Sequence, residues 1–297
     1  AITVEGRADG VITETEMAAD ESGELGLKEV VTIDEIKGTY RNLRYITEPV
    51  PVHLAQAKCY AYIYGIQNDL QKINVQMTYG NLDTGDLKYF SYEYSMQQLQ
   101  EWFSDLILKY KKWADFQYEW RKKRQASIKE LAFPFPYREG QKELAAGVYR
   151  TIARKKNLFI QAPTGVGKTI STLYPAIKAV GEGLGDKIFY LTAKTVTANV
   201  AKETLGILCE KGYRAKSVQI TAKEKLCPCE EVDCNPVSCP YAKGHFDRVN
   251  DAVYDLLQKE NNITREVLLA HAKEYQVCPF EMCLDTATWA DNIICDY

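Results

Sequence analysis

The sequence predicts an α/β protein with two domains. The first is an α+β domain built on two hairpins, and the second is a doubly wound parallel sheet with a phosphate-binding loop. Three observations support this. Paired strand-like runs dominate the chain before residue 130, helices alternate with short buried runs after Tyr137, and APTGVGKT (Ala162–Thr169) stands between an apparent strand and an apparent helix. We expect domains at 1–130 and 131–297, with a cysteine-rich insertion at 222–285.

The composition is that of a water-soluble globular chain. Of its 297 residues, 46% are hydrophobic and 26% are charged, and the net charge of -3 gives no overall attraction to nucleic acid. No apolar run approaches the roughly 18 residues of a membrane span, and the N-terminus lacks a secretory signal pattern. We therefore expect a cytoplasmic protein with no membrane association. Strand-like residues begin at Val4 with no initiating Met before them, so we expect a fragment.

For the first domain, the sequence predicts a hairpin, a helix, a second hairpin and a second helix, in that order. A basic and aromatic stretch, Lys109–Arg124, lies on the last helix, which Ser95 can cap. We interpret it as a solvated helix packed by its aromatics, with direct nucleic-acid contact as the alternative. The expected strands are 4–15, 28–37, 72–79 and 87–94, and the expected helices are 51–70 and 95–125.

The second domain follows the FPFP segment at 133–136, which interrupts the pattern. Helical and buried strand-like runs then alternate, as in βαβ units. The expected helices are 138–153, 169–180 and 195–209, and the expected strands are 157–161, 187–191, 215–220 and, after the insertion, 292–295.

The segment APTGVGKT predicts a site for a nucleoside triphosphate. Its glycines allow main-chain N–H groups to close around phosphate oxygens at the start of a helix, whose dipole also favours an anion. Lys168 supplies a positive charge for the phosphates, and the hydroxyl of Thr169 is placed for Mg²⁺. The expected cofactor-binding residues of the loop are Thr164, Gly165, Val166, Gly167, Lys168 and Thr169.

Six of the nine cysteines fall between Cys227 and Cys283, a distribution typical of metal ligands and not of a disulfide framework. Clustered thiolates favour Zn²⁺ or an iron–sulfur cluster. Zinc sites usually place paired cysteines two to four residues apart, and the spacing here does not follow that pattern cleanly. From the residues alone both metals stay open, with iron–sulfur favoured.

A family resemblance bears on the choice between zinc and an iron–sulfur cluster. The order of Tyr137 with Arg-x-x-Gln, then APTGVGKT, YLTAKT, KEKLC, CNP, CPYAKG and CPFE resembles the XPD/DinG family of iron–sulfur superfamily-two DNA helicases, from about Pro134 onward. The resemblance implies ATP and Mg²⁺ as cofactors, with Arg138 and Gln141 near the adenine, and DNA contact by the segment at Lys194 and Thr195. It implies a [4Fe–4S] cluster held by Cys227, Cys234, Cys239 and Cys278, with Cys229 and Cys283 as alternatives.

The resemblance also exposes an absence. Helicases of this family carry an Asp-Glu-Ala-His box and a second motor domain beyond the cluster, and neither is found up to Tyr297. Hydrolysis of ATP needs both. We therefore expect this chain to be an incomplete motor that can still bind nucleotide.

Carboxylates and a lysine recur on the first hairpin. Asp9 lies in GRADG on one run, and Glu35 and Lys37 lie one residue apart in IDEIK on the other, so the last two share a face. Asp34 then points to the opposite face. Such a group can hold Mg²⁺ at a scissile phosphate, with the lysine orienting the nucleophile. Charged residues alternating along a solvated hairpin are the simpler explanation.

A second resemblance favours the nuclease interpretation. GRADG, IDEIKG and QAKCY occur in the order found in the RecB-type branch of PD-(D/E)XK nucleases, over residues 4–60. The resemblance implies metal-binding Asp9 and Glu35, catalytic Lys37, and supporting Gln56 and Tyr60. The helix that precedes the hairpin in that family is missing. We interpret His53, which has no partner at ligand spacing, as a helix residue without a site role.

Together the patterns predict an ATP-dependent DNA helicase fused to a nuclease-like domain, acting in DNA repair or processing on DNA with a single-stranded portion. The family implies 5′ to 3′ movement. The alternative is a zinc-stabilised nucleic-acid-binding module whose hairpin carboxylates are inert.

Overall fold

The computed structural model describes residues 3–19, 25–163 and 165–296. The chain divides into two compact units, Ala1–Ala114 and Asp115–Tyr297. This division falls within a helix, earlier in the chain than the boundary predicted after residue 130, because the end of that helix packs with the second unit. Thr164, one of the predicted loop residues, lies outside the described residues.

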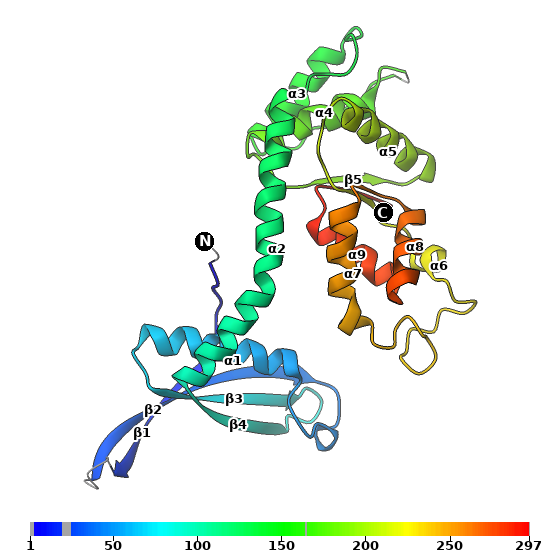
Figure 1. The fold of residues 1–297 in the computed structure, drawn as a ribbon. Helices are drawn as coiled ribbons and strands as arrows, with labels where there is room; N and C mark the ends of the chain where they lie inside the picture. The colour runs from blue at the N-terminus through cyan, green and yellow to red at the C-terminus, as the bar shows by residue number, and fades with distance from the viewer. Residues whose placement is uncertain (1–2, 20–24, 164, 297) are drawn as a thin grey trace. The chain divides into compact units, whose positions relative to one another are not determined.

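Unit 1 is a mixed four-stranded sheet with one helix across a face. The strand order is β1-β2-β3-β4, in which β2 and β3 are parallel and the two outer pairs are antiparallel. The parallel pairing requires a crossover, which the helix α1 supplies (Figure 1). Its Ala57 and Ala61 belong to the same buried core cluster as Ile33 and Val75. The elements are β1 (Gly10–Ala19), β2 (Leu25–Thr39), α1 (Pro51–Gln67), β3 (Lys72–Asn81) and β4 (Leu87–Ser95), with a short 3-10 turn, η1, at Leu43–Tyr45.

Both predicted hairpins are present, but the first strand begins later than expected. β1 begins at Gly10 instead of Val4, and Asp9 therefore lies just before the strand. Gly6 passes so close to Tyr60 that a Cβ atom there would lie 2.4 Å from the ring. The segment before Gly10 thus runs against α1 instead of extending the hairpin.

The helix α2 (Met96–Glu130) spans the division between the two units. Ser95 caps it as predicted, because its Oγ accepts from the main-chain N–H of Gln98 at 3.2 Å while Gln98 Oε1 accepts from Ser95 N at 2.9 Å. No helix in the described part of the chain is long and apolar enough to cross a bilayer.

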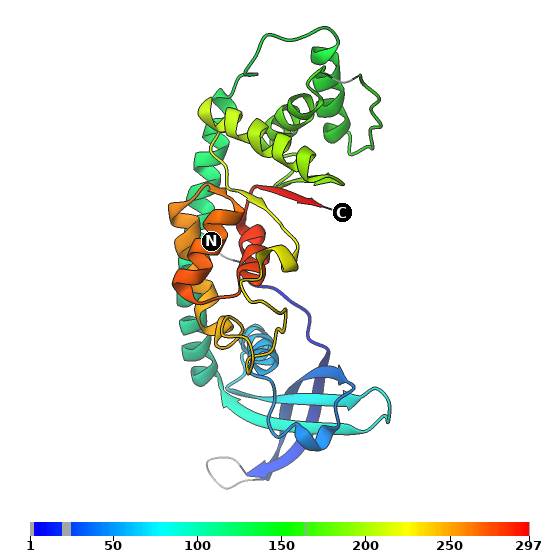
Figure 2. The same ribbon diagram turned by 90° about the vertical axis from the view of Figure 1, so that its right-hand side faces the viewer.

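Unit 2 is an all-parallel sheet with helices on both faces, as Figures 1 and 2 show. The strand order is β5-β8-β6-β7, so the last strand in the sequence lies inside the sheet. Helices α4 and α5 pack on one face, and α9 contacts the other. The elements are α3 (Gln141–Ala153), α4 (Lys168–Gly181), β5 (Ile188–Thr192), α5 (Thr195–Glu210), β6 (Ser217–Gln219), α6 (Lys223–Leu226), α7 (His245–Lys259), β7 (Asn262–Ile263), α8 (Arg265–Tyr275), α9 (Pro279–Trp289) and β8 (Asn292–Asp296).

The strand predicted at 157–161, directly before the phosphate loop, is absent. These residues form no ladder, and Phe159 is 96% exposed. A strand needs a hydrogen-bonding neighbour, and no described segment pairs with this one. The prediction of a buried strand here is therefore wrong for the described residues, although the remaining predicted strands of the parallel sheet are found.

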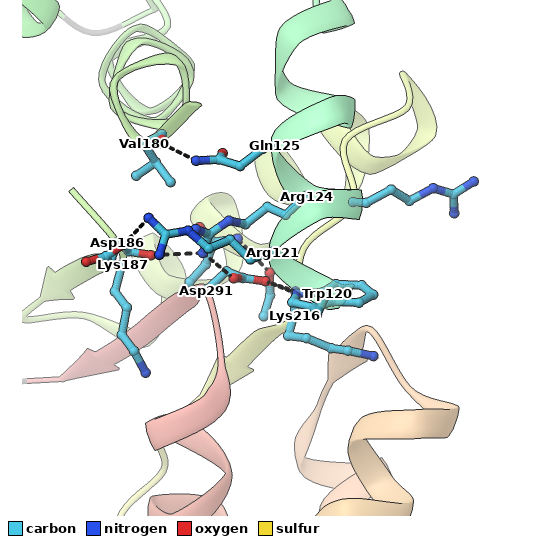
Figure 3. A network of polar contacts seen from close by, with 12 residues as sticks. Trp120, Arg121, Arg124, Gln125, Val180, Asp186, Lys187, Lys216 and Asp291 are labelled. Atoms are coloured by element: carbon cyan, nitrogen blue, oxygen red, sulfur yellow. Dashed lines mark hydrogen bonds and ion pairs between the residues drawn. The ribbon is translucent and has the colours of Figure 1, made fainter. Parts of the chain in front are cut away.

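A buried network fixes the end of α2 on unit 2 (Figure 3). Arg124 Nη1 lies 2.6 Å from Asp291 Oδ1, and the other carboxylate oxygen accepts from Trp120 Nε1 at 2.8 Å and from Lys216 N at 2.7 Å. Burial lowers the pKa of Lys216, whose ammonium lies over the Trp120 ring, to about 8. Asp291 immediately precedes β8, so one carboxylate joins α2 to two strands of the sheet.

Candidate functional site

The phosphate loop leads into α4 as the sequence predicts. Gly165 and Gly167 have φ angles of 85° and 74°, which are strained for other residues, and Gly167 is the N-cap of α4. The start of a helix presents unpaired N–H groups and the positive end of the dipole. The loop therefore carries the backbone features of an anion-binding site, even though the described residues before it form no strand.

Lys168 and Thr169 stand at the head of this helix. The ammonium of Lys168 donates to the carbonyls of Ala162 and Pro163, at 2.9 and 2.8 Å. It thus lies across the start of the loop, and a phosphate oxygen can replace these carbonyl acceptors. Thr169 is half-buried in the first turn of α4, and nothing in its surroundings tests its predicted contact with Mg²⁺.

Arg138 and Gln141 contact the loop directly. Gln141 is 4% exposed, and its Nε2 donates to the carbonyl of Val166 at 3.1 Å, while its Oε1 accepts from Arg138 N at 3.0 Å. The Arg138 guanidinium donates to the carbonyl of Gly165. The two residues that the resemblance implies for adenine therefore also shape the phosphate loop. Their contact with the base stays a prediction.

The clustered cysteines converge on one cavity of about 200 Å³ in unit 2. Lys223 lies at its edge and donates to Cys234 Sγ at 3.8 Å, and its ammonium is also 3.5 Å from Glu281 Oε1. The cysteines that line this cavity are the four predicted ligands and a fifth thiol: Cys227, Cys229, Cys234, Cys239 and Cys278.

Cys229 and Cys283, the two alternative ligands, lie in different surroundings. Cys229 faces the cavity and interacts with the thiols of Cys227 and Cys239; burial, followed by these contacts, raises its pKa to about 11. Cys283 does not line the cavity, because its Sγ donates to the carbonyl of Gln219 at 3.7 Å. Burial also raises the pKa of Cys278. Metal binding by these thiols would therefore displace protons.

The donors that line this cavity are mainly sulfur atoms. In the described ranges, no three His, Cys, Asp or Glu side chains are grouped closely enough to hold a single metal ion. A zinc ion needs its four donors at about 2.0–2.3 Å from one point, whereas a four-iron cluster spreads its thiolates around a larger core. Five thiols line the cavity, and thiolate is the donor type that either metal centre would use.

The nuclease-like residues of unit 1 form a connected group. Lys37 Nζ lies 2.5 Å from Glu35 Oε1 and 3.3 Å from Gln56 Oε1, and Gln56 Nε2 donates to Tyr60 OH at 3.1 Å. Asp9 Oδ2 accepts from the main-chain N–H of Ile36 at 2.9 Å, which places it beside the same strand. Strand β2 and helix α1 thus bring together Glu35, Lys37, Gln56 and Tyr60. The segment before β1 places Asp9 beside β2.

The charges of this group suit a cation site. Glu35 is 1% exposed, and its Oε2 is buried without a partner among the described residues. Hydrogen bonding to Glu35 raises the pKa of Lys37, with help from the charge of Asp9, so Lys37 stays an ammonium at neutral pH. Lys37 can then orient a nucleophile or offset negative charge, but it is not a general base. Asp34 accepts from Thr78 Oγ1 at 2.7 Å, on the opposite face as predicted.

Two histidines lie near the candidate sites, and the sequence predicted a site role for neither of them. His53 Nδ1 lies 3.1 Å from Tyr79 OH. Burial, followed by the charge of Lys37 in the nuclease-like group, lowers the pKa of His53. Its spacing of three residues before Gln56 is a helical-face signal that could have found it. His245 lines the cysteine cavity, and no sequence spacing marks it.

Comparison with known proteins gives one short similarity. No family model matches the chain. A segment of 51 residues, 17% of the chain, is 51% identical to a probable ATP-dependent helicase of Methanocaldococcus jannaschii, and it spans only 8% of that protein. Part of the chain is thus similar in sequence to an ATP-dependent helicase.

Proposed function

We propose that this chain is a cytoplasmic protein that carries the ATP-binding part of an ATP-dependent DNA helicase of the XPD/DinG type. The helicase would act in DNA repair or processing on DNA with a single-stranded portion. The observation that carries the proposal is the phosphate loop, in which Gly165 and Gly167 precede Lys168, the first residue of α4. Arg138 and Gln141 donate hydrogen bonds to carbonyls of this loop. The short similarity to a probable helicase supports it. Movement from 5′ to 3′ is part of the proposal and follows from the family resemblance alone.

In this proposal the loop N–H groups and Lys168 bind the polyphosphate, and Thr169 provides a hydroxyl for Mg²⁺. Cys227, Cys234, Cys239 and Cys278 would hold a [4Fe–4S] cluster, which supplies a rigid sulfur-ligated centre for the insertion at 222–285. Lys223 places a positive charge 3.8 Å from the Cys234 sulfur.

Nucleotide binding tests the motor part of the proposal. Titration of the chain with a fluorescent ATP analogue and Mg²⁺ should give saturable binding, and Lys168→Ala should weaken it at least about tenfold, because a charge-assisted contact is lost. Lys211→Ala removes an exposed lysine after α5 and should leave binding unchanged. Equal affinity in the wild type and Lys168→Ala would refute a phosphate role for this loop.

Metal analysis separates this proposal from the alternative of a zinc-stabilised binding module. Protein purified without oxygen should contain iron and sulfide, with brown absorbance near the blue end. Stoichiometric zinc without sulfide would instead support the zinc-stabilised module.

We also propose a metal-dependent nuclease site in unit 1, because the buried and unpartnered Glu35 Oε2 beside Lys37 is a costly arrangement that a divalent cation would satisfy. Glu35 and Asp9 would hold Mg²⁺, Lys37 would orient the nucleophile, and Gln56 and Tyr60 would hold Lys37.

Cleavage of single-stranded DNA with Mg²⁺ or Mn²⁺ tests this second site. Lys37→Ala should abolish cleavage without changing nucleotide binding in unit 2. Lys72→Ala, which removes an exposed lysine of β3 paired with Glu93, is the matched control and should cleave normally. Cleavage that persists in Lys37→Ala would assign the lysine a structural role only.

A further inference from the structure

The loop that follows β2 exposes two tyrosines and two arginines. Tyr40 and Tyr45 are 72% and 80% exposed, and Arg41 and Arg44 are also exposed. Among the described residues, none of these four side chains has a hydrogen-bond or ion-pair partner. Rings and guanidinium groups without partners on one short loop mark a candidate binding surface, which we call the Tyr/Arg loop (residues 39–46).

The main chain of the Tyr/Arg loop is fixed, although these side chains are free. Asn81 Nδ2, at the end of β3, donates to the carbonyl of Arg41 at 3.1 Å. Lys88 Nζ, on β4, donates to the carbonyl of Leu43 at 3.2 Å. Both bonds end on main-chain atoms of the loop, so truncation of the exposed side chains leaves them intact. A loop that is already held in place loses little conformational entropy when it binds a partner.

The Tyr/Arg loop begins next to the nuclease-like group. β2 carries Glu35 and Lys37 and ends at Thr39. Tyr40 follows Lys37 by three residues, which is at most roughly 11 Å along the chain. The other end of the loop leads to α1, which carries Gln56. A strand with one phosphate at Glu35 and Lys37 would therefore bring its neighbouring nucleotides to this loop.

The chemistry of the loop fits a single strand of nucleic acid. Residues 39–46 contain two arginines and no acidic residue, and Lys88 adds a positive charge beside them. Guanidinium groups bind phosphates, and tyrosine rings stack on unpaired bases of any sequence. Asp83 and Asp86, on the turn after β3, reduce the net positive charge nearby, so stacking has to contribute to the affinity. The bases of a duplex are already stacked on one another, so the rings favour an unpaired strand.

We propose that the Tyr/Arg loop is the surface on which the nuclease-like site of unit 1 holds single-stranded DNA. Arg41 and Arg44 bind phosphates of the strand, and Tyr40 and Tyr45 stack on its bases. The role of this surface in cleavage rests on the proposed nuclease site, whereas the binding of the strand requires no cleavage.

Crosslinking of the whole chain to oligothymidylate tests the binding directly. Ca²⁺ replaces Mg²⁺ so that the strand stays uncut, and peptide mass spectrometry locates the ultraviolet crosslinks separately from any contact in unit 2. We expect crosslinks on Tyr40 or Tyr45, and excess duplex DNA should not reduce them. Tyr89 is the control without crosslinks, because it is 53% exposed but pairs with Thr78. Thr78 donates to Asp34, on the face of the sheet opposite to the nuclease-like group.

The arginines are tested by the salt dependence of this crosslinking. Arg41→Ala combined with Arg44→Ala should raise the oligonucleotide concentration that gives half-maximal crosslinking. It should also reduce the slope of log affinity against log salt concentration by about 1.4, the value for two phosphate contacts of a single strand. Lys72→Ala removes an exposed positive charge at the other end of β3, paired with Glu93, and should change neither quantity.

The tyrosines are tested by the kinetics of cleavage in Mg²⁺. Tyr40→Ala combined with Tyr45→Ala should raise KM at least about tenfold and leave kcat unchanged, because stacking holds the substrate and the transition state equally. Tyr40→Phe combined with Tyr45→Phe keeps both rings and should keep the wild-type KM. Tyr89→Ala, the matched control, should also keep it.

The outcomes separate this inference from the proposed nuclease. Absence of crosslinks from residues 39–46, equal competition by duplex DNA, or an unchanged salt slope in the arginine variant would overturn the inference. If the wild type still cleaves DNA in that case, the nuclease site stands without this surface. Crosslinks on the loop of a wild-type chain that does not cleave would refute the nuclease site and support the DNA-binding surface alone.

Discussion

The nuclease-like group of unit 1 and the phosphate loop of unit 2 are supported in different ways. In unit 1, strand β2 and helix α1 each contribute side chains that already contact one another, and Lys37 joins them. In unit 2, the loop between residues 161 and 168 follows a segment without strand pairing, and Lys168 contacts carbonyls of its own loop. Among the described residues, Arg138 and Gln141 contact it from outside.

The difference shows what each kind of site requires. A group drawn from neighbouring strands and a crossover helix is assembled as soon as the sheet forms, because register places its side chains. A phosphate loop depends on backbone conformation, which the glycines, the helix and contacts from other segments must hold together. We therefore expect mutations that disturb the packing around each site to affect the two regions unequally.

The largest effect is expected from the buried carboxylate that joins α2 to the sheet of unit 2. Asp291→Ala leaves the Arg124 guanidinium, which is 7% exposed, without its counter-charge, and should destabilise unit 2 by about 3–5 kcal/mol. Hydrogen exchange measured by mass spectrometry reports on each unit separately, and unit 1 should keep its protection. Asp186→Ala removes the partner of an exposed Arg121 pair and should cost at most about 1 kcal/mol. Equal effects of the two changes would contradict the role of the buried network.

The next largest effect is expected from a substitution that breaks the ion pair of Glu35 and Lys37 in unit 1. Lys37→Met leaves the buried Glu35 carboxylate unpaired and should destabilise unit 1 by about 2 kcal/mol, less than a fully buried pair because Lys37 is partly exposed. The double change Glu35→Gln with Lys37→Met removes the charge and should restore most of that loss. Urea unfolding followed by the same exchange measurement tests both variants. If the double variant is as unstable as the single one, the cost does not come from an unpaired charge.

A smaller effect tests how the phosphate loop is braced. Gly167→Ala forces a side chain into φ 74° and places a Cβ atom 2.6 Å from Gln141 Nε2. Gly183→Ala has the same φ but meets nothing within 4 Å, so it reports backbone strain alone, about 1–2 kcal/mol. Gly167→Ala should exceed this control in thermal destabilisation and should also weaken binding of the ATP analogue. Equal melting temperatures would show that Gln141 does not hold the loop.

The smallest effect is expected from a substitution in residues 157–161, directly before the phosphate loop. Phe159→Ser changes a side chain that is 96% exposed and should alter the free energy of unfolding by less than about 0.5 kcal/mol. A loss of several kcal/mol, as expected for a buried aromatic side chain, would show that residues 157–161 pair as a strand after all.

Local patterns in the sequence determined much of this protein. The two hairpins, the cap at Ser95, the helix after the phosphate loop and the alternation in unit 2 depend on neighbours close in sequence, and all are present. The shared face of Glu35 and Lys37 likewise follows from strand alternation, and the helical spacing of Gln56 and Tyr60 places these two together.

Only the tertiary structure decided the rest, because it depends on which distant segments meet. Strand order decides the parallel pairing of β2 with β3 and the place of β8 between β5 and β6. It also decides that no described segment pairs with residues 157–161. The same holds for side chains from separate helices. His245 reaches the backbone of Cys278 only because α7 and α9 pack together, and a fifth thiol, Cys229, joins the four predicted ligands because the loop that carries them folds around one cavity.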